Sequence, residues 1–156
     1  MEYETTPPNL MEMMREHDGA LLIGDDALRA VWGDYPYHHY DLGELWHRFT
    51  GKWMTFAVWA VREEAYEENP SLLNRVYHAF LSGKERSRRE LLPIIRTAQE
   101  RAGGSEEEWR RYFAGLSHDL GPTQIDGLET YYDYALRLGL LSHRPVIRLV
   151  PALHAL

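Results

Sequence analysis

The sequence predicts an α/β fold whose C-terminal part is largely helical, and two observations support this prediction. Two short apolar runs, at residues 20–23 and 54–61, are typical of strands that a sheet buries on both faces. From Asn69 onward, apolar residues instead recur at helical spacing, in four successive stripes. The 156 residues have the size of one domain and are enough to bury a sizeable core.

The first elements along the chain alternate between helix and strand. Residues 9–17 predict a short helix, and the run at 20–23 predicts a buried strand. Gly24 and Asp25 end that strand, and a helix is predicted to begin at Asp26. In open α/β sheets, ligands bind just outside such strand ends. The corner formed by the glycine and the aspartate is therefore a candidate ligand site.

A second helix and a second strand follow. Four apolar residues at positions i, i+3, i+4 and i+7 predict the helix, namely Leu42, Leu45, Trp46 and Phe49. Gly51 lies where a C-terminal cap would end this helix. The run at 54–61 has only one polar residue, Thr55, and its valines and aromatic residues favour a strand.

The rest of the sequence predicts four helices and a short tail. The helices are expected over the apolar stripes at 72–81, 91–98, 109–116 and 125–136. Ser105 and Glu108 form a capping-box pattern at the start of the third of these helices. The last helix is expected to end near Gly139, and the tail from Pro145 to Leu153 is apolar and strand-like.

Composition and charge exclude several classes of function. The chain has no cysteine, which excludes a disulfide framework and a thiolate metal site. Its net charge of -7 argues against nucleic acid or an anionic membrane as a partner. No apolar run approaches the roughly 20 residues that cross a bilayer, and the acidic start lacks the features of a signal peptide. We therefore expect a soluble, cytoplasmic protein that binds neither nucleic acid nor a membrane.

Five short blocks occur in an order that one enzyme family uses. They are LIGD at 22–25, YDLGE at 40–44, TG at 50–51, FAVW at 56–59 and LSHDLG at 116–121. Together they cover about residues 10–141, and over this span the sequence resembles chorismate dehydratase of the futalosine route to menaquinone. The order of the blocks carries the resemblance, because each block alone is common.

The resemblance implies a fold like that of the type 2 periplasmic binding proteins, in which two α/β lobes enclose a substrate cleft. The chain, 1–156, would form a single partial domain. About 10–53 would be the remainder of the second lobe, about 54–141 would return into the first lobe, and 142–156 would be an unassigned tail. The N-terminal part of the family's fold would be absent. Because the family's catalytic polar residues would be absent with it, the catalytic residues are unknown.

The implied reaction is the loss of water from chorismate, which gives 3-[(1-carboxyvinyl)oxy]benzoate, so the enzyme would be a hydro-lyase. Aromatisation of the ring drives this reaction, and no metal or organic cofactor is required. The block FAVW favours it over the reaction of the related 1,4-dihydroxy-6-naphthoate synthase. A non-catalytic remnant that binds a small molecule is the remaining alternative. We expect the chain by itself neither to dehydrate chorismate nor to bind it tightly.

The residues expected to contact chorismate come from three of the blocks: Gly24, Asp25, Tyr40, Asp41, Phe56 and Trp59. Most of them have a structural alternative, because an aspartate at such a position can cap a helix and an aromatic residue in an apolar run can be core. Three histidines, at 38, 39 and 47, lack the spacing of a metal site. The missing lobe would leave apolar surface exposed, so we also expect homodimers or aggregates.

Overall fold

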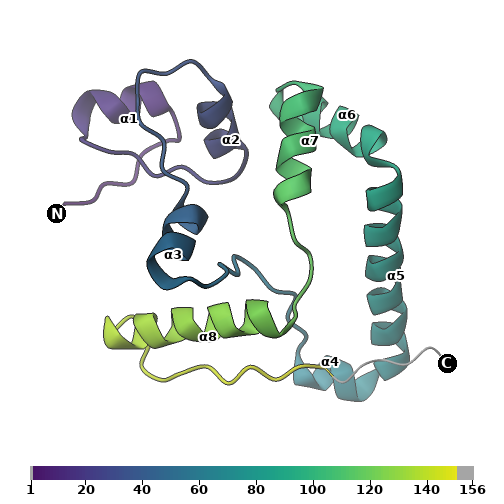
Figure 1. The fold of residues 1–156 in the computed structure, drawn as a ribbon. Coiled ribbons are helices and arrows are strands. Elements are labelled where there is room, and N and C mark those ends of the chain that lie inside the picture. Colours follow the sequence, from purple (N-terminus) through teal and green to yellow (C-terminus); the bar gives the residue numbers. More distant parts are fainter. Residues whose placement is uncertain (1, 151–156) are drawn as a thin grey trace. The chain divides into compact units, whose positions relative to one another are not determined.

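The computed structural model of the protein describes residues 2–150, and this part of the chain folds into eight helices (Figure 1). They are α1 (Leu10–Glu16), α2 (Gly24–Trp32), α3 (Leu42–Thr50), α4 (Glu63–Glu68), α5 (Pro70–Arg89), α6 (Leu91–Ala102), α7 (Glu106–Gly115) and α8 (Pro122–Arg137). The prediction of a largely helical C-terminal part is confirmed. The helices belong to two compact units: one combines the residues up to His39 with Glu90–Leu116, and the other combines Tyr40–Arg89 with the residues from Ser117 onward.

Neither of the two expected strands forms. Residues 20–23 and 54–61 are neither helix nor strand. A helix satisfies its own backbone, whereas a strand exists only as part of a ladder with a neighbour. No such ladder joins any two segments among residues 2–150. The prediction of strands is therefore wrong for this part of the chain, while the two-lobed architecture and its boundaries near 53 and 141 stay predictions.

The core of the first unit is formed by α6, α7 and α2. Ile95 and Ala102 of α6 and Trp109 of α7 are buried, and Leu28 and Trp32 of α2 pack against them. The two tryptophan rings meet edge to face with their centroids 4.9 Å apart, which is a favourable geometry for aromatic pairs. The apolar stripe predicted for 91–98 is thus the buried face of α6.

A glycine and a capping box close the turn between α6 and α7. Gly104 has a φ of 82°, and a Cβ at this position would lie 2.8 Å from the Trp32 ring. The Ser105 hydroxyl accepts the backbone N–H of Glu108 at 3.2 Å, and the Glu108 carboxylate accepts the backbone N–H of Ser105 at 2.7 Å. The predicted capping box is therefore confirmed, and it fixes the start of α7.

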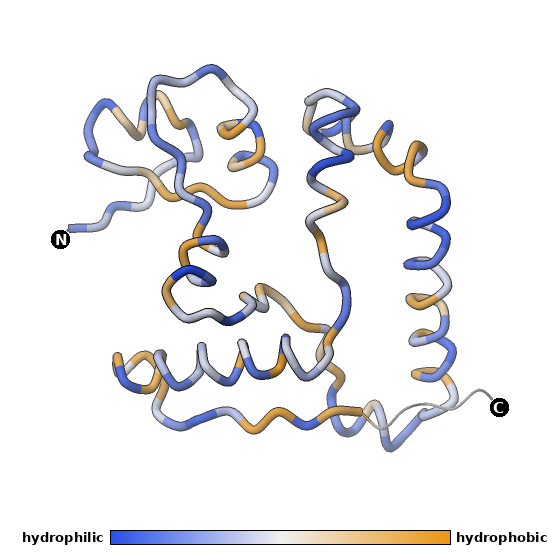
Figure 2. The backbone as a smooth tube through the Cα atoms, viewed as in Figure 1, coloured by the Kyte–Doolittle hydropathy of each residue, from blue (hydrophilic) through white to orange (hydrophobic). Residues whose placement is uncertain are grey.

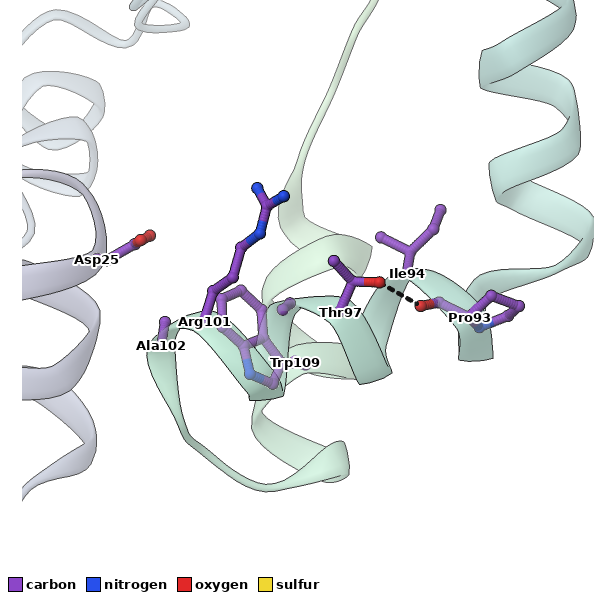
Figure 3. Close-up of a pocket in the computed structure, with 8 residues that line it drawn as sticks. Asp25, Pro93, Ile94, Thr97, Arg101, Ala102 and Trp109 are labelled. Atoms are coloured by element: carbon purple, nitrogen blue, oxygen red, sulfur yellow. Dashed lines mark hydrogen bonds between the residues drawn. The ribbon is translucent and has the colours of Figure 1, made fainter.

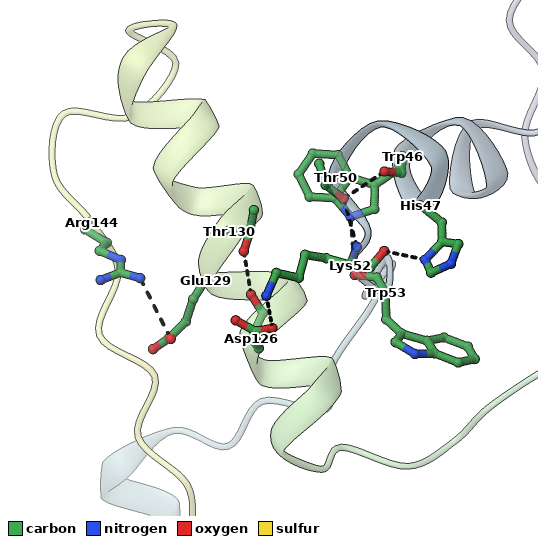
Figure 4. Close-up of polar contacts among 9 residues, drawn as sticks. All are labelled: Trp46, His47, Thr50, Lys52, Trp53, Asp126, Glu129, Thr130 and Arg144. Atoms are coloured by element: carbon green, nitrogen blue, oxygen red, sulfur yellow. Dashed lines mark hydrogen bonds and ion pairs between the residues drawn. The ribbon is translucent and has the colours of Figure 1, made fainter.

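In the second unit, the chain that follows α3 is held against α8 (Figure 4). Lys52 forms an ion pair of 2.5 Å with Asp126 of α8. The Trp46 ring of α3 packs edge to face against two tyrosine rings of α8. Gly127 is buried beneath Trp53, and a Cβ at position 127 would overlap the Trp53 carbonyl oxygen. Close backbone approach therefore explains a glycine in the middle of this helix.

The longest helix, α5, has 20 residues, and its last turn is strongly basic. Lys84 and Arg88 of α5 both pair with Asp119, at 2.5 Å and 3.6 Å.

No helix in the described part of the chain is both long enough and apolar enough to cross a membrane.

The segment that follows α8 is joined to helices of the second unit by arginine ion pairs. Arg144 pairs with Asp133 of α8 at 3.1 Å, and Arg148 makes two hydrogen bonds of 3.0 Å to Glu63 of α4. The expected strand from Pro145 is absent up to Val150, and the rest of it lies outside the described residues.

Candidate functional site

The corner predicted at Gly24 and Asp25 forms the start of α2. Gly24 has a φ of 62°, and the space where its Cβ would stand is empty, so backbone conformation rather than crowding requires glycine here. The helix begins at Gly24 instead of the expected Asp26, and no side chain caps it. The alternative in which Asp25 caps the helix is therefore wrong. Asp25 instead lies in the first turn, where a carboxylate interacts favourably with the helix dipole.

Asp25 lines an open pocket of about 500 Å³ in the first unit (Figure 3). The other lining residues come from α6 and α7: Pro93, Ile94, Thr97, Ala98, Arg101, Ala102 and Trp109. Figure 3 shows Asp25 projecting from α2 toward the side of the pocket that α6 forms. Most of the lining is apolar, with one carboxylate, one hydroxyl and one guanidinium group among it. Such a composition is typical of sites for small organic molecules.

The polar groups of this pocket can hold an organic acid. Arg101 lies in the last turn of α6, and its guanidinium can bind a carboxylate through two parallel hydrogen bonds. The Thr97 hydroxyl donates to the carbonyl oxygen of Pro93 at 3.2 Å, which leaves its lone pairs able to accept a hydrogen bond. Trp109 is buried and supplies an apolar wall. The pocket therefore pairs a cationic group with an apolar surface.

The sequence analysis missed Thr97 and Arg101, although a signal for them exists. Ile94, Thr97, Ala98 and Arg101 recur at i, i+3, i+4 and i+7, so they lie on one face of α6. This spacing places Thr97 and Arg101 on one face of α6 with apolar residues, a pattern that any amphipathic helix can have. This face of α6 becomes the wall of a pocket only together with residues of α2 and α7, which the local sequence does not indicate.

A second group of predicted site residues surrounds the start of α3. The Asp41 side chain accepts the backbone N–H of Glu44 at 2.8 Å, so the helix-cap alternative is confirmed for this residue. The Phe56 ring lies over Gly43, where a Cβ would stand 2.8 Å from the ring and 3.1 Å from the Asp41 carboxylate. Tyr40 precedes the cap and is exposed. A role for these residues in substrate binding stays a prediction.

The two aromatic residues of the FAVW block are not core residues. Phe56 is 74% exposed and Trp59 is 84% exposed, which contradicts the alternative that they are buried. The reason is the missing ladder, because a segment that is not part of a sheet is not covered on both faces. Trp59 instead rests on Phe80 of α5, with ring centroids 4.6 Å apart.

The six predicted residues do not gather into one site within either unit. Gly24 and Asp25 belong to the first unit, and the other four belong to the second. Within residues 2–150, no group of three or more His, Cys, Asp or Glu side chains could hold a metal ion.

Residues 2–150 are largely helical, and the first unit has an open pocket lined by one carboxylate, one hydroxyl and one guanidinium group. A sequence model of the family described as menaquinone biosynthesis matches residues 1–137. The chain therefore belongs to the menaquinone biosynthesis family. The matched span contains the Asp25 and Arg101 pocket and all six predicted site residues. Family membership supports a role in menaquinone biosynthesis, and with it an enzymatic role on a small-molecule substrate.

Proposed function

We propose that this chain is part of a chorismate dehydratase of menaquinone biosynthesis and that its pocket contributes, weakly by itself, to the binding of chorismate. The observation that carries the proposal is the family match over residues 1–137, which spans the five ordered blocks of the sequence. The blocks resemble the dehydratase in particular, because FAVW at 56–59 favours it over related enzymes of the family. The catalytic base is not assigned.

The chemistry of chorismate matches the pocket in the first unit. Chorismate carries one carboxylate and a hydroxyl on its ring, and a second carboxylate on an enolpyruvyl ether side chain. In our proposal the Arg101 guanidinium binds one carboxylate and the ring lies against the wall that Trp109 supplies. Asp25, at the opposite side, accepts a hydrogen bond from the ring hydroxyl. One carboxylate and the ring hydroxyl of the ligand then each meet a group of complementary charge or hydrogen-bonding character.

The reaction itself demands little beyond positioning. A base removes the proton on ring C3, the hydroxyl on C4 takes up a proton and leaves as water, so that the C3 proton and the hydroxyl together account for the water lost, and the electron pair of the broken C–H bond completes an aromatic ring. Aromatisation supplies the driving force, so the protein mainly orients the substrate and balances its carboxylate charges. Arg101 is a binding residue in this scheme, not a catalytic one.

Replacement of one arginine tests the proposed pocket. Arg101→Ala should weaken chorismate binding about tenfold or more, because a hydrogen bond to a charged group contributes roughly 1.5–3 kcal/mol. Arg96→Ala, on the same helix but outside the pocket lining, should leave the affinity unchanged. Ligand-observed NMR measures both affinities even when binding is weak. Equal loss in the two variants, or no binding by the unmodified chain, would contradict the proposal.

A product assay separates binding from chemistry. The chain is incubated with chorismate, and 3-[(1-carboxyvinyl)oxy]benzoate is followed by chromatography. Product formed by the unmodified chain, and reduced in Arg101→Ala, would support a complete dehydratase. Binding without product would support a chain that supplies only the substrate-binding part of the enzyme. Release of a different aromatic product would instead favour another reaction of the family.

A further inference from the structure

Helix α2 supplies one residue to the lining of the pocket, Asp25. Asp25, Leu28 and Trp32 occur at i, i+3 and i+7, so all three lie on one face of the helix. Leu28 and Trp32 pack against the buried residues of α6 and α7, and Figure 2 shows hydrophobic, orange stretches in both α2 and α6. The start of this face therefore borders the pocket, while the rest of it holds α2 against the other two helices.

The Trp32 side chain lies between the turn that joins α6 and α7 and the ring of Trp109. The two indole rings meet edge to face, with their centroids 4.9 Å apart. A Cβ on Gly104 would lie 2.8 Å from the Trp32 ring and 3.2 Å from the indole nitrogen of Trp109. The backbone of the turn and both rings are therefore closely packed, which limits how far Trp32 can shift.

The groups that surround Trp32 are themselves held in place by hydrogen bonds. The indole N–H of Trp109 donates to the carbonyl oxygen of Gly103 at 2.7 Å. The side-chain amide of Gln99 donates to the carbonyl oxygen of Gly104 at 3.0 Å. Trp109 also lines the pocket. The ring against which Trp32 packs is therefore at the same time a wall of the pocket.

We infer that Trp32 is a positioning residue of the pocket, because its packing on α7 holds α2 where Asp25 borders the pocket. The neighbouring Asp26 is paired with Arg29 at 2.6 Å, whereas Asp25 makes no hydrogen bond or ion pair within residues 2–150. The placement of α2 therefore decides where the Asp25 carboxylate lies. The inference rests on the proposed function for the role of Asp25 in binding, and on the packing alone for its placement.

The placement of α2 can be measured without any ligand, because the natural chain has no cysteine to compete with introduced ones. Asp25→Cys on α2 and Glu100→Cys on α6 carry nitroxide labels, and electron paramagnetic resonance gives the distribution of the distance between them. This distribution should be narrow. Trp32→Ala should broaden it, whereas Trp32→Phe should keep it narrow, because a phenyl ring can still pack edge to face on Trp109. An unchanged distribution in Trp32→Ala would overturn the inference.

Two controls separate this effect from a general loss of structure. Val31→Ala removes an apolar side chain of α2 that is 57% exposed and is not part of the packed face, so it should leave the distribution narrow. A second label pair, Arg96→Cys on α6 and Arg110→Cys on α7, should keep its distribution when Trp32→Ala is added. Broadening of that second distance would show that Trp32 supports the whole unit and not the placement of α2, which would overturn the inference.

The affinity for chorismate tests whether Trp32 acts through Asp25. Asp25→Ala and Trp32→Ala should each weaken binding by a similar factor, roughly tenfold, and the double variant should bind no more weakly than either one. Trp32→Phe should bind like the natural chain. Losses that multiply in the double variant would show that Trp32 acts in another way and would overturn the inference. If the natural chain binds no chorismate, the proposed function fails, and the label distance still decides whether Trp32 places Asp25.

Discussion

Asp41 on α3 and Ser105 on α7 are two of the side chains that cap helix starts in this protein. Both accept a backbone N–H from the third residue of their helix, at 2.8 Å and 3.2 Å. These N–H groups have no partner within the helix itself, so a cap removes the cost of leaving them unpaired. Caps depend on residues three positions apart, and for that reason the sequence analysis could recognise both positions.

Asp41 has two interpretations, a helix cap and a substrate ligand, and a pair of substitutions separates them. Asp41→Ala should lower the free energy of unfolding by about 1 kcal/mol, the usual cost of losing a cap. Asp41→Asn should cost much less, because asparagine caps almost as well as aspartate. Chemical denaturation measures both values. If Asp41→Asn keeps the stability of the natural chain but loses chorismate binding, the carboxylate has a role beyond the cap.

The capping box at α7 should make stability depend on pH. The backbone N–H and the hydroxyl of Ser105 donate to the Glu108 carboxylate and hold its pKa below the usual 4.5. A pKa that is lower in the folded state gives stability that is present above the unfolded value and is lost as the pH falls through the folded value. The unfolding midpoint of the natural chain should therefore drop on acidification below 4.5.

Glutamine provides the control for this pH effect, because it completes a capping box but does not titrate. Glu108→Gln should show a smaller drop of the urea midpoint than the natural chain over the same pH range. Glu100→Gln, at an exposed position on α6, should follow the natural chain. An identical pH profile for Glu108→Gln and the natural chain would show that the box does not contribute.

At the scale of elements, the segment that follows Gly51 connects α3 to α8. Its residues Lys52 and Trp53 contact α8. The Lys52–Asp126 ion pair is partly exposed, and such pairs contribute little to stability. The close approach at Gly127 is different, because the backbone of Trp53 occupies the space of a side chain. The backbone of Trp53 can pack against α8 only because residue 127 has no Cβ.

Gly127→Ala should therefore destabilise the second unit, although alanine normally favours a helix. We expect a loss of about 1–3 kcal/mol from overpacking, because the carbonyl of Trp53 must move. Gly83→Ala is the matched control, since Gly83 also lies within a helix but has nothing within 4 Å of its Cβ position. That variant should be stabilised by about 0.5–1 kcal/mol. Thermal unfolding compares the two, and a stable Gly127→Ala variant would contradict the packing argument.

The helices could be predicted from sequence because their signals are local. Spacing of apolar residues indicated α3, α6 and α8, and the Ser105 box indicated the start of α7. The runs at 20–23 and 54–61 carried equally clear strand signals, yet whether a strand forms depends on a neighbour that local sequence does not specify. Seven of the eight residues that line the pocket were not predicted as site residues, for a related reason. Arg101 lines a pocket together with Asp25 only because α2, distant in the sequence, reaches the same place.

At the scale of the whole molecule, few apolar side chains are buried among residues 2–150. The buried apolar residues are Ala30, Ile95, Ala102, Trp109, Leu128 and Ala135, and three of these six are alanines. Larger side chains such as Trp59 remain exposed. Exposed apolar surface of this kind usually marks a contact with another molecule.

The division of the first unit into two stretches of sequence has a consequence for the order in which the chain folds during synthesis. The ribosome releases α2 long before α6 and α7, and Trp32 then has no ring to pack against until Trp109 emerges. The turn that joins α6 and α7 is short, so these two helices can pair as soon as they leave the ribosome, whereas docking of α2 must close a long loop. In the nascent chain α2 therefore stays without its packing partners until α6 and α7 have been made.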